Sequence, residues 1–527
     1  MSLFAGYAPG RYFDEMFAAD GSPRPHYRSL FRGLWGLRER AFAAKCDLAA
    51  RSYLTQGITF AYKGREQPFP FDLLPRVIPA AEWAELERGL IQRVRALDHF
   101  VADVYGERRA VRDGVVPNRL VVTSNAFQRE MAGVVPPAGR YIHIAGIDLI
   151  RDEQGTWRVL EDNARTPSGL SYVVQNRAFM RRVFAEAFVS HEVEPVDHAP
   201  FLMHEALMAA APEGVEHPRV VLLTPGPYNA AYYEHAFLAQ QMGVTLVEGH
   251  DLVVRDRRVW VKTTSGHEPV DVIYRRIDDA FLDPVAFRSD SVLGVPGLMQ
   301  CYRAGTVAVC NAVGVGVADD KAIYCYVPDL IRYYLGEEPF LEQVPTYRLE
   351  REEDRAYVLG NLDRLVVKAV DGAGGYGMLV GPHATPDERR EFGRRVLANP
   401  RGYIAQETIA LSRAPVFLDG RFRARHVDLR PFVLYGREPR VVPGGLTRVA
   451  LREGSLAGLG RAHDLVAGGA HAREPLLVHL RVAILFGIVL ERLVGRDGGA
   501  PVAAEGPRER GDDLVVAARE VLGEEPA

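Results

Sequence analysis

The sequence predicts a mixed α/β (α+β) fold with a helical N-terminal region and a small α/β subdomain. Residues 28–56 and 80–110 carry helical periodicity, with apolar side chains gathered on one face. Strand-like segments begin near residue 119, and residues 219–275 alternate strand, helix and strand. Because 527 residues exceed what one hydrophobic core usually serves, we expect two or three subdomains.

The overall composition is that of a soluble globular protein. The net charge is −4, and 25% of the residues are charged, so no basic field indicates nucleic acid or an acidic membrane surface. The N-terminus lacks a cationic start followed by an apolar core, and the longest apolar run, 482–490, is too short to cross a bilayer. Four cysteines without a CxxC spacing indicate reduced thiols. We therefore expect a cytoplasmic protein without a nucleic-acid or membrane partner.

The helical region is expected to pack against a large hydrophobic core. In residues 80–105 one helical face carries a row of apolar side chains: Trp83, Leu86, Leu90, Val94, Leu97 and Val101. The connector "FPFDLLPRVIP" before it has three prolines and is expected to be extended.

The next segments, 119–124, 141–152 and 157–163, are expected to be strands, the last two joined by the turn "DEQG". Pairing around this turn would bring the side-chain oxygens of Asp148, Glu161 and Asn163 to one end of a hairpin. Carboxylate and amide oxygens are the ligands that Mg²⁺ takes, so these three residues form a candidate metal set. A solvated acidic turn is the alternative. Arg165 argues against that alternative as a candidate anion clamp, although a local ion pair of small value would also explain it.

A glycine-rich loop follows Lys368 in "VVKAVDGAGGYGMLVG". Glycines let backbone N–H groups approach a phosphate closely, and a nearby ammonium offsets its charge. The loop is neither a Walker A loop nor a Rossmann fingerprint, and a tight hairpin with a surface lysine explains it equally well. Lys321, at the start of an expected helix, supplies a second ammonium, as a triphosphate contacted from two sides would need.

Two further segments have weaker signals. The strand "YIAQETI" is a candidate adenine edge near Gln406, Glu407 and Ile409, although an ordinary amphipathic strand is the stronger interpretation of this segment alone. In "TPGPYNAAYYEHAF", Glu234 is a candidate for attracting an amine, as is Asp278 further along the chain. The tyrosines beside Glu234 fit core packing at least as well.

Together these motifs, with "GIDLIRD", "VLEDNARTPSGLSYV" and "GGLTRVAL", resemble the circularly permuted ATP-grasp type 2 family, which is similar to the ATP-grasp portion of glutathionylspermidine synthase. The resemblance covers roughly residues 25–455 and implies a circularly permuted ATP-grasp core, in which the metal acids precede the nucleotide lysines. It also implies a role for each matching residue. The residues implied to bind Mg²⁺ are Asp148, Glu161 and Asn163. Those implied to bind ATP are Lys321 and Lys368, with Gly374, Gly375 and Gly377 covering the phosphates and Gln406 to Ile409 contacting adenine. The residues implied to lie beside the transferred phosphoryl group are Arg165 and Arg448.

The resemblance further implies a domain order and an activity. We expect a helical region over 1–115, a metal-binding half over 116–215, a small α/β subdomain over 216–304, a nucleotide-binding half over 305–455 and a divergent tail over 456–527. The implied reaction is ATP- and Mg²⁺-dependent ligation of a carboxylate to an amine through an acyl-phosphate. Because the tail lacks the ending usual in similar proteins, an ATP-binding protein without turnover is one alternative. An ATP-dependent small-molecule kinase is the other.

Overall fold

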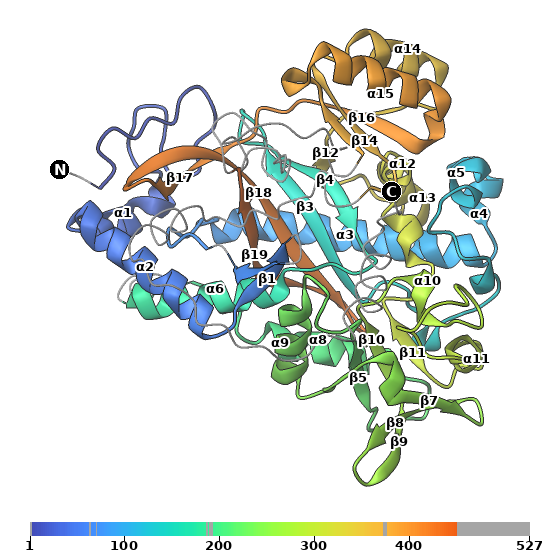
Figure 1. Cartoon of the computed structure of the whole chain (residues 1–527). Coiled ribbons are helices and arrows are strands. Elements are labelled where there is room, and N and C mark those ends of the chain that lie inside the picture. Colours follow the sequence, from blue (N-terminus) through green and yellow to red (C-terminus); the bar gives the residue numbers. More distant parts are fainter. Residues whose placement is uncertain are drawn as a thin grey trace, which may run out of the picture.

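The computed structural model describes residues 3–62, 65–69, 71–185, 188, 193–372 and 377–450 (Figure 1). The predicted tail, its expected helix at 475–494, and Gly374 and Gly375 lie outside these residues. Within them, the N-terminal region is helical as the periodicity predicts. Its elements are α1 (Arg28–Trp35), α2 (Glu39–Thr55), the hairpin β1 (Thr59–Tyr62) and β2 (Arg65–Pro68), and the long helix α3 (Ala80–Tyr105).

The prediction of a strand over 119–124 is wrong, because this segment forms the short helix α5 (Asn118–Val122) after α4 (Arg109–Arg112). Pro117 precedes α5 with φ −60°, the value at which a proline ring starts a helix without strain. Leu120 and Val121 are buried and Val122 is exposed. A run of three apolar residues fits one turn of helix as well as a short strand, and its periodicity is too brief to separate the two.

A six-stranded sheet occupies the centre of the molecule (Figure 1). Its strand order is β12-β4-β3-β18-β17, with β19 paired to β18. The bounds are β3 (Ile144–Arg151), β4 (Trp157–Asn163), β12 (Glu342–Gln343), β17 (Arg413–Leu418), β18 (Arg421–Tyr435) and β19 (Pro439–Val449). The predicted hairpin is confirmed, because β3 and β4 pair antiparallel with Asp148 opposite Glu161 and Gly146 opposite Asn163. Apolar side chains of α3, β3 and β4 share one large core.

The predicted strand–helix–strand segment forms a parallel sheet of order β11-β10-β5-β6. Its strands are β5 (Val220–Leu223), β6 (Thr245–Val247), β10 (Val272–Arg275) and β11 (Ala308–Cys310). A three-stranded sheet of β7 (Leu252–Arg255), β8 (Arg258–Thr263) and β9 (Gly266–Val270) accompanies it. The associated helices are α6 (Leu170–Val183), α8 (Ala199–Met208), α9 (Tyr232–Met242), α10 (Asp279–Leu282) and α11 (Leu298–Arg303).

A second antiparallel sheet, of order β13-β16-β14-β15, lies with α14 and α15 at one end of the molecule (Figure 1). Its elements are β13 (Thr346–Arg348), α14 (Glu352–Gly360), β14 (Leu365–Ala369), β15 (Met378–Val380), α15 (Pro386–Ala398) and β16 (Tyr403–Glu407), and the helices α12 (Lys321–Tyr324) and α13 (Val327–Leu335) precede it. The sheet and its helices have a small apolar core of their own around Val358, Leu365 and Val367. None of the helices among the described residues has the length and apolar character needed to cross a membrane.

A buried ion pair joins α3 to the hairpin. Arg93 on α3 donates hydrogen bonds from Nε and Nη2 to the two carboxylate oxygens of Asp162, at 2.6 and 2.7 Å. Both side chains are nearly inaccessible to solvent. Because neighbouring strand residues point to opposite faces, this contact directs Glu161 and Asn163 away from α3.

We expect Arg93→Met to lower the free energy of unfolding by about 3–5 kcal/mol, because it leaves the Asp162 charge buried without a partner. Urea unfolding followed by tryptophan fluorescence measures this loss. The double variant Arg93→Met/Asp162→Leu removes both charges and is expected to recover most of it. A single variant as stable as the unaltered protein would contradict the structural role assigned to this pair.

Candidate active site

The open end of the β3–β4 hairpin carries the predicted metal residues. Asp148 is fully buried on β3, and its cross-strand partner Glu161 is partly exposed on β4. Asn163, two residues further, shares the face of Glu161, and its Nδ2 is buried without a hydrogen-bond partner among the described residues. Within the described part of the chain, no three His, Cys, Asp or Glu side chains are grouped as a metal site. The predicted set consists of two carboxylates and an amide.

Two arginines hold Asp148. Arg430 donates from Nε and Nη2 to the two carboxylate oxygens at 2.5 and 2.8 Å, and Arg448 donates from Nη2 at 2.7 Å. Burial alone would raise the pKa of Asp148, but Arg430 and Arg448 hold that pKa below its ordinary value. Asp148 is therefore a carboxylate at neutral pH. A cation at this carboxylate would compete with the guanidinium groups for its oxygens.

Arg448, predicted beside the transferred phosphoryl group, lies inside this buried network. Its Nε donates to both oxygens of Asp428, at 2.9 and 3.0 Å, and its side chain is 3% exposed. The acids Asp148 and Asp428 hold the pKa of the guanidinium above its ordinary value, although burial opposes this. In this structure Arg448 therefore fixes Asp148, and its contact with a phosphoryl group remains a prediction.

The sequence analysis missed Arg430. The signal for it was present in "HVDLRPFVLY", where Asp428 and Arg430 stand two apart in an otherwise apolar strand and so face one side. Charged side chains in such a strand are rarely buried without a partner. The partner of Arg430, Asp148, lies 282 residues away in sequence, so no local pattern identifies it.

The two predicted lysines lie at this same place. Lys321 Nζ is 3.6 Å from Glu161 Oε2 and donates a hydrogen bond to the Gly372 carbonyl at 2.7 Å. Lys368, on β14, is 6% exposed. Burial lowers the pKa of Lys368 to about 8, while Glu161 and Asp148 raise it and Lys321 and Arg448 lower it further. The 3.6 Å contact between Glu161 and Lys321 joins an acid of the earlier half of the chain to an ammonium group of the later half, and the effects on the pKa of Lys368 are consistent with its lying near both.

The candidate adenine strand β16 runs beside this cluster. Gln406 is buried, and its Nε2 donates to Thr346 Oγ1 at 3.0 Å and to the Leu160 carbonyl at 3.5 Å. Glu407 Oε1 accepts a hydrogen bond from the Tyr347 hydroxyl at 2.6 Å. Ile409 packs against a small apolar cluster of Ile150, Leu160, Val344 and Leu411. Most of these groups therefore have structural partners, whereas Gln406 Oε1 is buried without a hydrogen-bond partner among the described residues, and adenine recognition by this strand remains a prediction.

Gly377 closes the described part of the glycine loop. Its φ is +63°, and a Cβ atom there would lie 2.9 Å from the Cβ of Ala369. Its carbonyl accepts a hydrogen bond from the Ala369 N–H at 2.9 Å. Both observations explain the glycine by the close approach of its backbone to Ala369, just before β15. A phosphate role for Gly377 stays a prediction.

Arg165 lies among acids. Its guanidinium is 3.4 Å from Asp278 and 3.8 Å from Asp319, its Nε has no hydrogen-bond partner among the described residues, and its side chain is 34% exposed. Asp319, which the sequence analysis did not single out, accepts the backbone N–H groups of Ala164 and Arg165 at 2.5 and 3.2 Å. Burial raises the pKa of Asp319 to about 6, against the opposing effect of Arg165. Arg165 is thus a partly accessible cation in an acidic setting.

Asn311 is a second residue without a sequence signal. Its Oδ1 accepts the N–H groups of His143 and Ile144 at 2.7 and 2.8 Å, and its Nδ2 donates to the carbonyls of Ile144 and Ala164 at 2.6 and 2.5 Å. The side chain is 1% exposed. Asn311 therefore joins the start of β3 to the residue that follows β4, and helps to set the spacing of the metal residues.

Glu234 does not have the free carboxylate that an amine site would need. It accepts hydrogen bonds from the Gly169 and Ser171 N–H groups and from the Ser171 hydroxyl at the start of α6, and Arg276 lies 3.3 Å away. The neighbouring Tyr233 stacks on aromatic rings of the core. Its packing supports the core interpretation of these tyrosines. Asp278, by contrast, is 52% exposed and faces Arg165.

Comparisons with known proteins find relatives that match most of this chain. A protein of Synechocystis sp. is 51% identical over 455 residues, which are 85% of this chain and 95% of that protein. A Frankia casuarinae protein provisionally named glutamate–cysteine ligase 2-2 is 45% identical over 452 residues, and this chain spans 52% of its length.

Among solved structures, a glutathione synthetase-like effector from Globodera pallida, in its apo form, superposes with a TM-score of 0.54 at 13% identity. The match covers 79% of this chain and 96% of the effector, and it shows a shared fold. The circularly permuted ATP-grasp type 2 family model matches residues 75–450. With most of its length matched, this chain belongs to the circularly permuted ATP-grasp type 2 family.

Proposed function

We propose that this protein is an ATP- and Mg²⁺-dependent ligase that joins a carboxylate to an amine through an acyl-phosphate. One observation carries the proposal: Glu161 and Asp148, from one half of the chain, lie beside Lys321 and Lys368, from the other half. Ammonium groups can bind the phosphates of a nucleotide, and adjacent oxygen donors can bind the cation that accompanies them. Family membership and the shared fold support this pairing.

The residues present fit both groups. Glu161 has an accessible carboxylate whose ionic partner among the described residues is Lys321, and Asn163 adds an amide on the same face. These hard oxygen donors suit Mg²⁺, with Asp148 as a third donor once a guanidinium gives way. When bound, the ion would supply positive charge next to the phosphate oxygens. Lys321 and Lys368 would hold the triphosphate, with Gly374, Gly375 and Gly377 over it and Gln406 to Ile409 at the adenine.

The proposed reaction consists of two displacements. A carboxylate oxygen of the first substrate bonds to the γ-phosphorus of ATP as the bond to ADP breaks. The amine nitrogen of the second substrate then bonds to the acyl carbon, inorganic phosphate leaves, and the nitrogen releases a proton. Arg165, partly exposed and two residues beyond Asn163, would orient the carboxylate in this proposal, while Arg448 and Arg430 keep Asp148 ionised.

The chemical class of the substrates follows from this reaction. Both are small molecules or peptides, one offering a carboxylate and the other an amine. The provisional ligase name of the Frankia casuarinae relative is consistent with this class. In this proposal the domain order is the one expected from the sequence, with boundaries near residues 115, 215, 304 and 455. The protein is proposed to be cytoplasmic.

Purified protein, ATP and Mg²⁺ with a panel of amino acids, short peptides and polyamines test the function directly. We expect ADP release that requires both an acid and an amine, and a product whose mass equals the two reactants less one water. A phosphorylated reactant without ligation would indicate a kinase. ATP binding without any ADP release across the panel would indicate a protein that does not turn over.

We expect Glu161→Gln to lower Mg²⁺-dependent turnover by about 10²–10³-fold, because an oxygen donor of the proposed metal set loses its charge. ADP release at a series of Mg²⁺ concentrations measures the effect. Glu153→Gln, in the exposed turn of the same hairpin, is the matched control and should retain full turnover. Unchanged Mg²⁺ dependence in Glu161→Gln would remove this residue from the metal set.

Lys368 gives the affinity for ATP a predicted pH dependence. Its pKa is lowered to about 8 in the free protein, so the ammonium is present below that pH and is lost as the pH rises through it. We expect ATP affinity to fall above pH 8, approaching tenfold per pH unit. Equilibrium binding of ATP from pH 7 to 9.5 measures this fall.

The variant Lys368→Met tests whether this residue causes the fall in ATP affinity above pH 8. It should bind ATP weakly at every pH and lack the fall above pH 8, whereas Lys262→Met, on an exposed strand, should behave like the unaltered protein. An identical pH profile in Lys368→Met would assign the effect to another group.

A further inference from the structure

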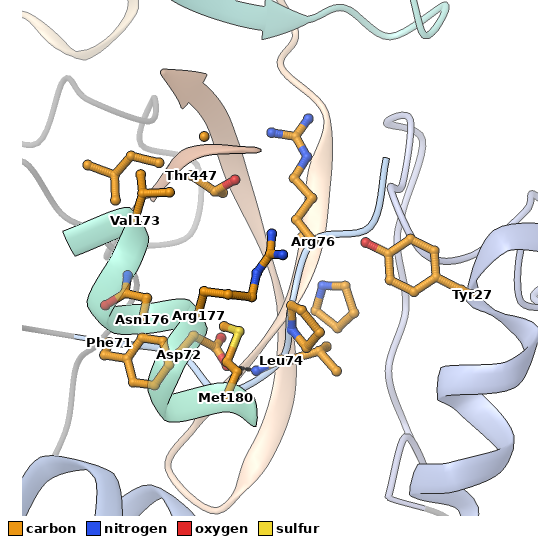
Figure 2. Close-up of a pocket in the computed structure, with 15 residues that line it drawn as sticks. Tyr27, Phe71, Asp72, Leu74, Arg76, Val173, Asn176, Arg177, Met180 and Thr447 are labelled. Carbon is orange, nitrogen blue, oxygen red and sulfur yellow. Dashed lines mark hydrogen bonds between the residues drawn. The ribbon is translucent and has the colours of Figure 1, made fainter. Parts of the chain in front are cut away.

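A cavity of about 110 Å³ lies away from the predicted nucleotide site. It is partly open to solvent and is lined by the connector 71–76 before α3, by α6, by the start of β17 and by residues 445–447 of β19 (Figure 2). Thr447 lines this cavity, whereas the next residue, Arg448, points to Asp148 and Asp428. Because adjacent strand residues face opposite sides, β19 separates the cavity from the acid–lysine cluster.

The cavity holds one cation whose charge is not matched. Arg177 extends from α6 into the middle of the lining residues (Figure 2). Its Nη1 donates to the Glu194 carbonyl at 2.7 Å, and no carboxylate of the described residues forms an ion pair with it. The other arginine of the lining, Arg76, is paired with Glu15 at 2.5 Å. An anion that entered the cavity would therefore meet a guanidinium with no carboxylate of the described residues at ion-pair distance, and Asp197 acts on its charge only from farther away.

The one acid in the lining does not cancel this charge. Asp72 is 3% exposed, its Oδ1 accepts the Leu74 N–H at 2.9 Å, and its Oδ2 is buried without a hydrogen-bond partner among the described residues. Burial raises the pKa of Asp72 to about 8, so at neutral pH the carboxyl group keeps its proton. A protonated carboxyl can donate a hydrogen bond, and an anionic oxygen is a suitable acceptor.

The rest of the lining sets the size and polarity of a ligand. Asn176 uses its Oδ1 to accept the Tyr53 hydroxyl at 2.7 Å, so its amide N–H groups are the part left for a ligand. Leu74, Val173 and Met180 form an apolar side of the cavity. A cavity of about 150 Å³ holds benzene, so this smaller one suits only a few carbon atoms.

We propose that this cavity binds a short-chain carboxylate, with its anionic end at Arg177 and its carbon chain against the apolar side. The proposed ligand has about three to five carbon atoms, given the size comparison with benzene. The inference does not depend on the proposed ligase activity. Arg76, which also lines the cavity, donates to the Asp428 carbonyl at 3.1 Å, so a bound ligand would touch the strands that carry the buried network.

Saturation-transfer NMR with propionate tests the proposal on the full chain. We expect saturable binding of propionate and at least about tenfold weaker binding of propionamide, which has the same shape without the charge. Arg177→Gln should weaken propionate binding by a similar factor, and Arg177→Lys should restore part of it. Arg182→Gln is the matched control, because Arg182 is an exposed arginine of the same helix that is not among the charges acting on Arg177, and it should leave binding unchanged.

Two further variants keep the test decisive. Arg165→Gln changes the residue proposed to orient the substrate carboxylate and should leave propionate binding intact, which separates this cavity from a substrate site. Val173→Phe fills the cavity and should abolish binding, and it replaces Arg177→Gln if thermal unfolding shows that the latter is misfolded. Equal binding of propionate and propionamide, or full binding in both Arg177→Gln and Val173→Phe, would overturn the proposal.

Discussion

The rest of the site depends on a buried carboxylate that must be compensated. Asp148 has no access to solvent, and an isolated buried charge is too costly to survive in a folded protein. Arg430 on β18 and Arg448 on β19 supply the compensation, and Asp428 in turn holds Arg448. Three strands are thereby fixed to one point. The position of the face that carries Glu161 and Asn163 therefore depends on this buried network.

Alternation along β4 gives each of its polar residues a separate task. Asp162 faces α3 and is paired with Arg93, while Glu161 and Asn163 face the lysines. Asn311 then joins the start of β3 to the residue after β4 through four hydrogen bonds between its side chain and backbone groups. The hairpin is consequently held from both sides, which is what a site that relies on positioning requires.

Much of the fold and of the candidate site could be predicted from the sequence. The predictions failed where contacts between distant parts of the chain decide the structure. The helix at 80–105 and the Asp148–Glu161 pairing follow from local periodicity and turn chemistry, and the meeting of Glu161 with Lys321 was implied by the family resemblance. The role of Arg430 and Asn311 was missed because their partners lie far away in sequence. Residues 118–122 and Glu234 were misjudged because short apolar runs and single acids fit several environments, and packing decides among them.

The order of the strands also constrains how the chain is made. Asp148 and Arg448 are separated by 300 residues, so the acid leaves the ribosome long before its arginines exist. At 5–20 residues per second, this interval lasts about 15–60 s. During that time the nascent hairpin contains an uncompensated carboxylate, and burying this carboxylate away from water is unfavourable. Final closure of the central sheet is therefore an event that follows translation of β19, and the N-terminal half alone is a poor candidate for an independently folded fragment.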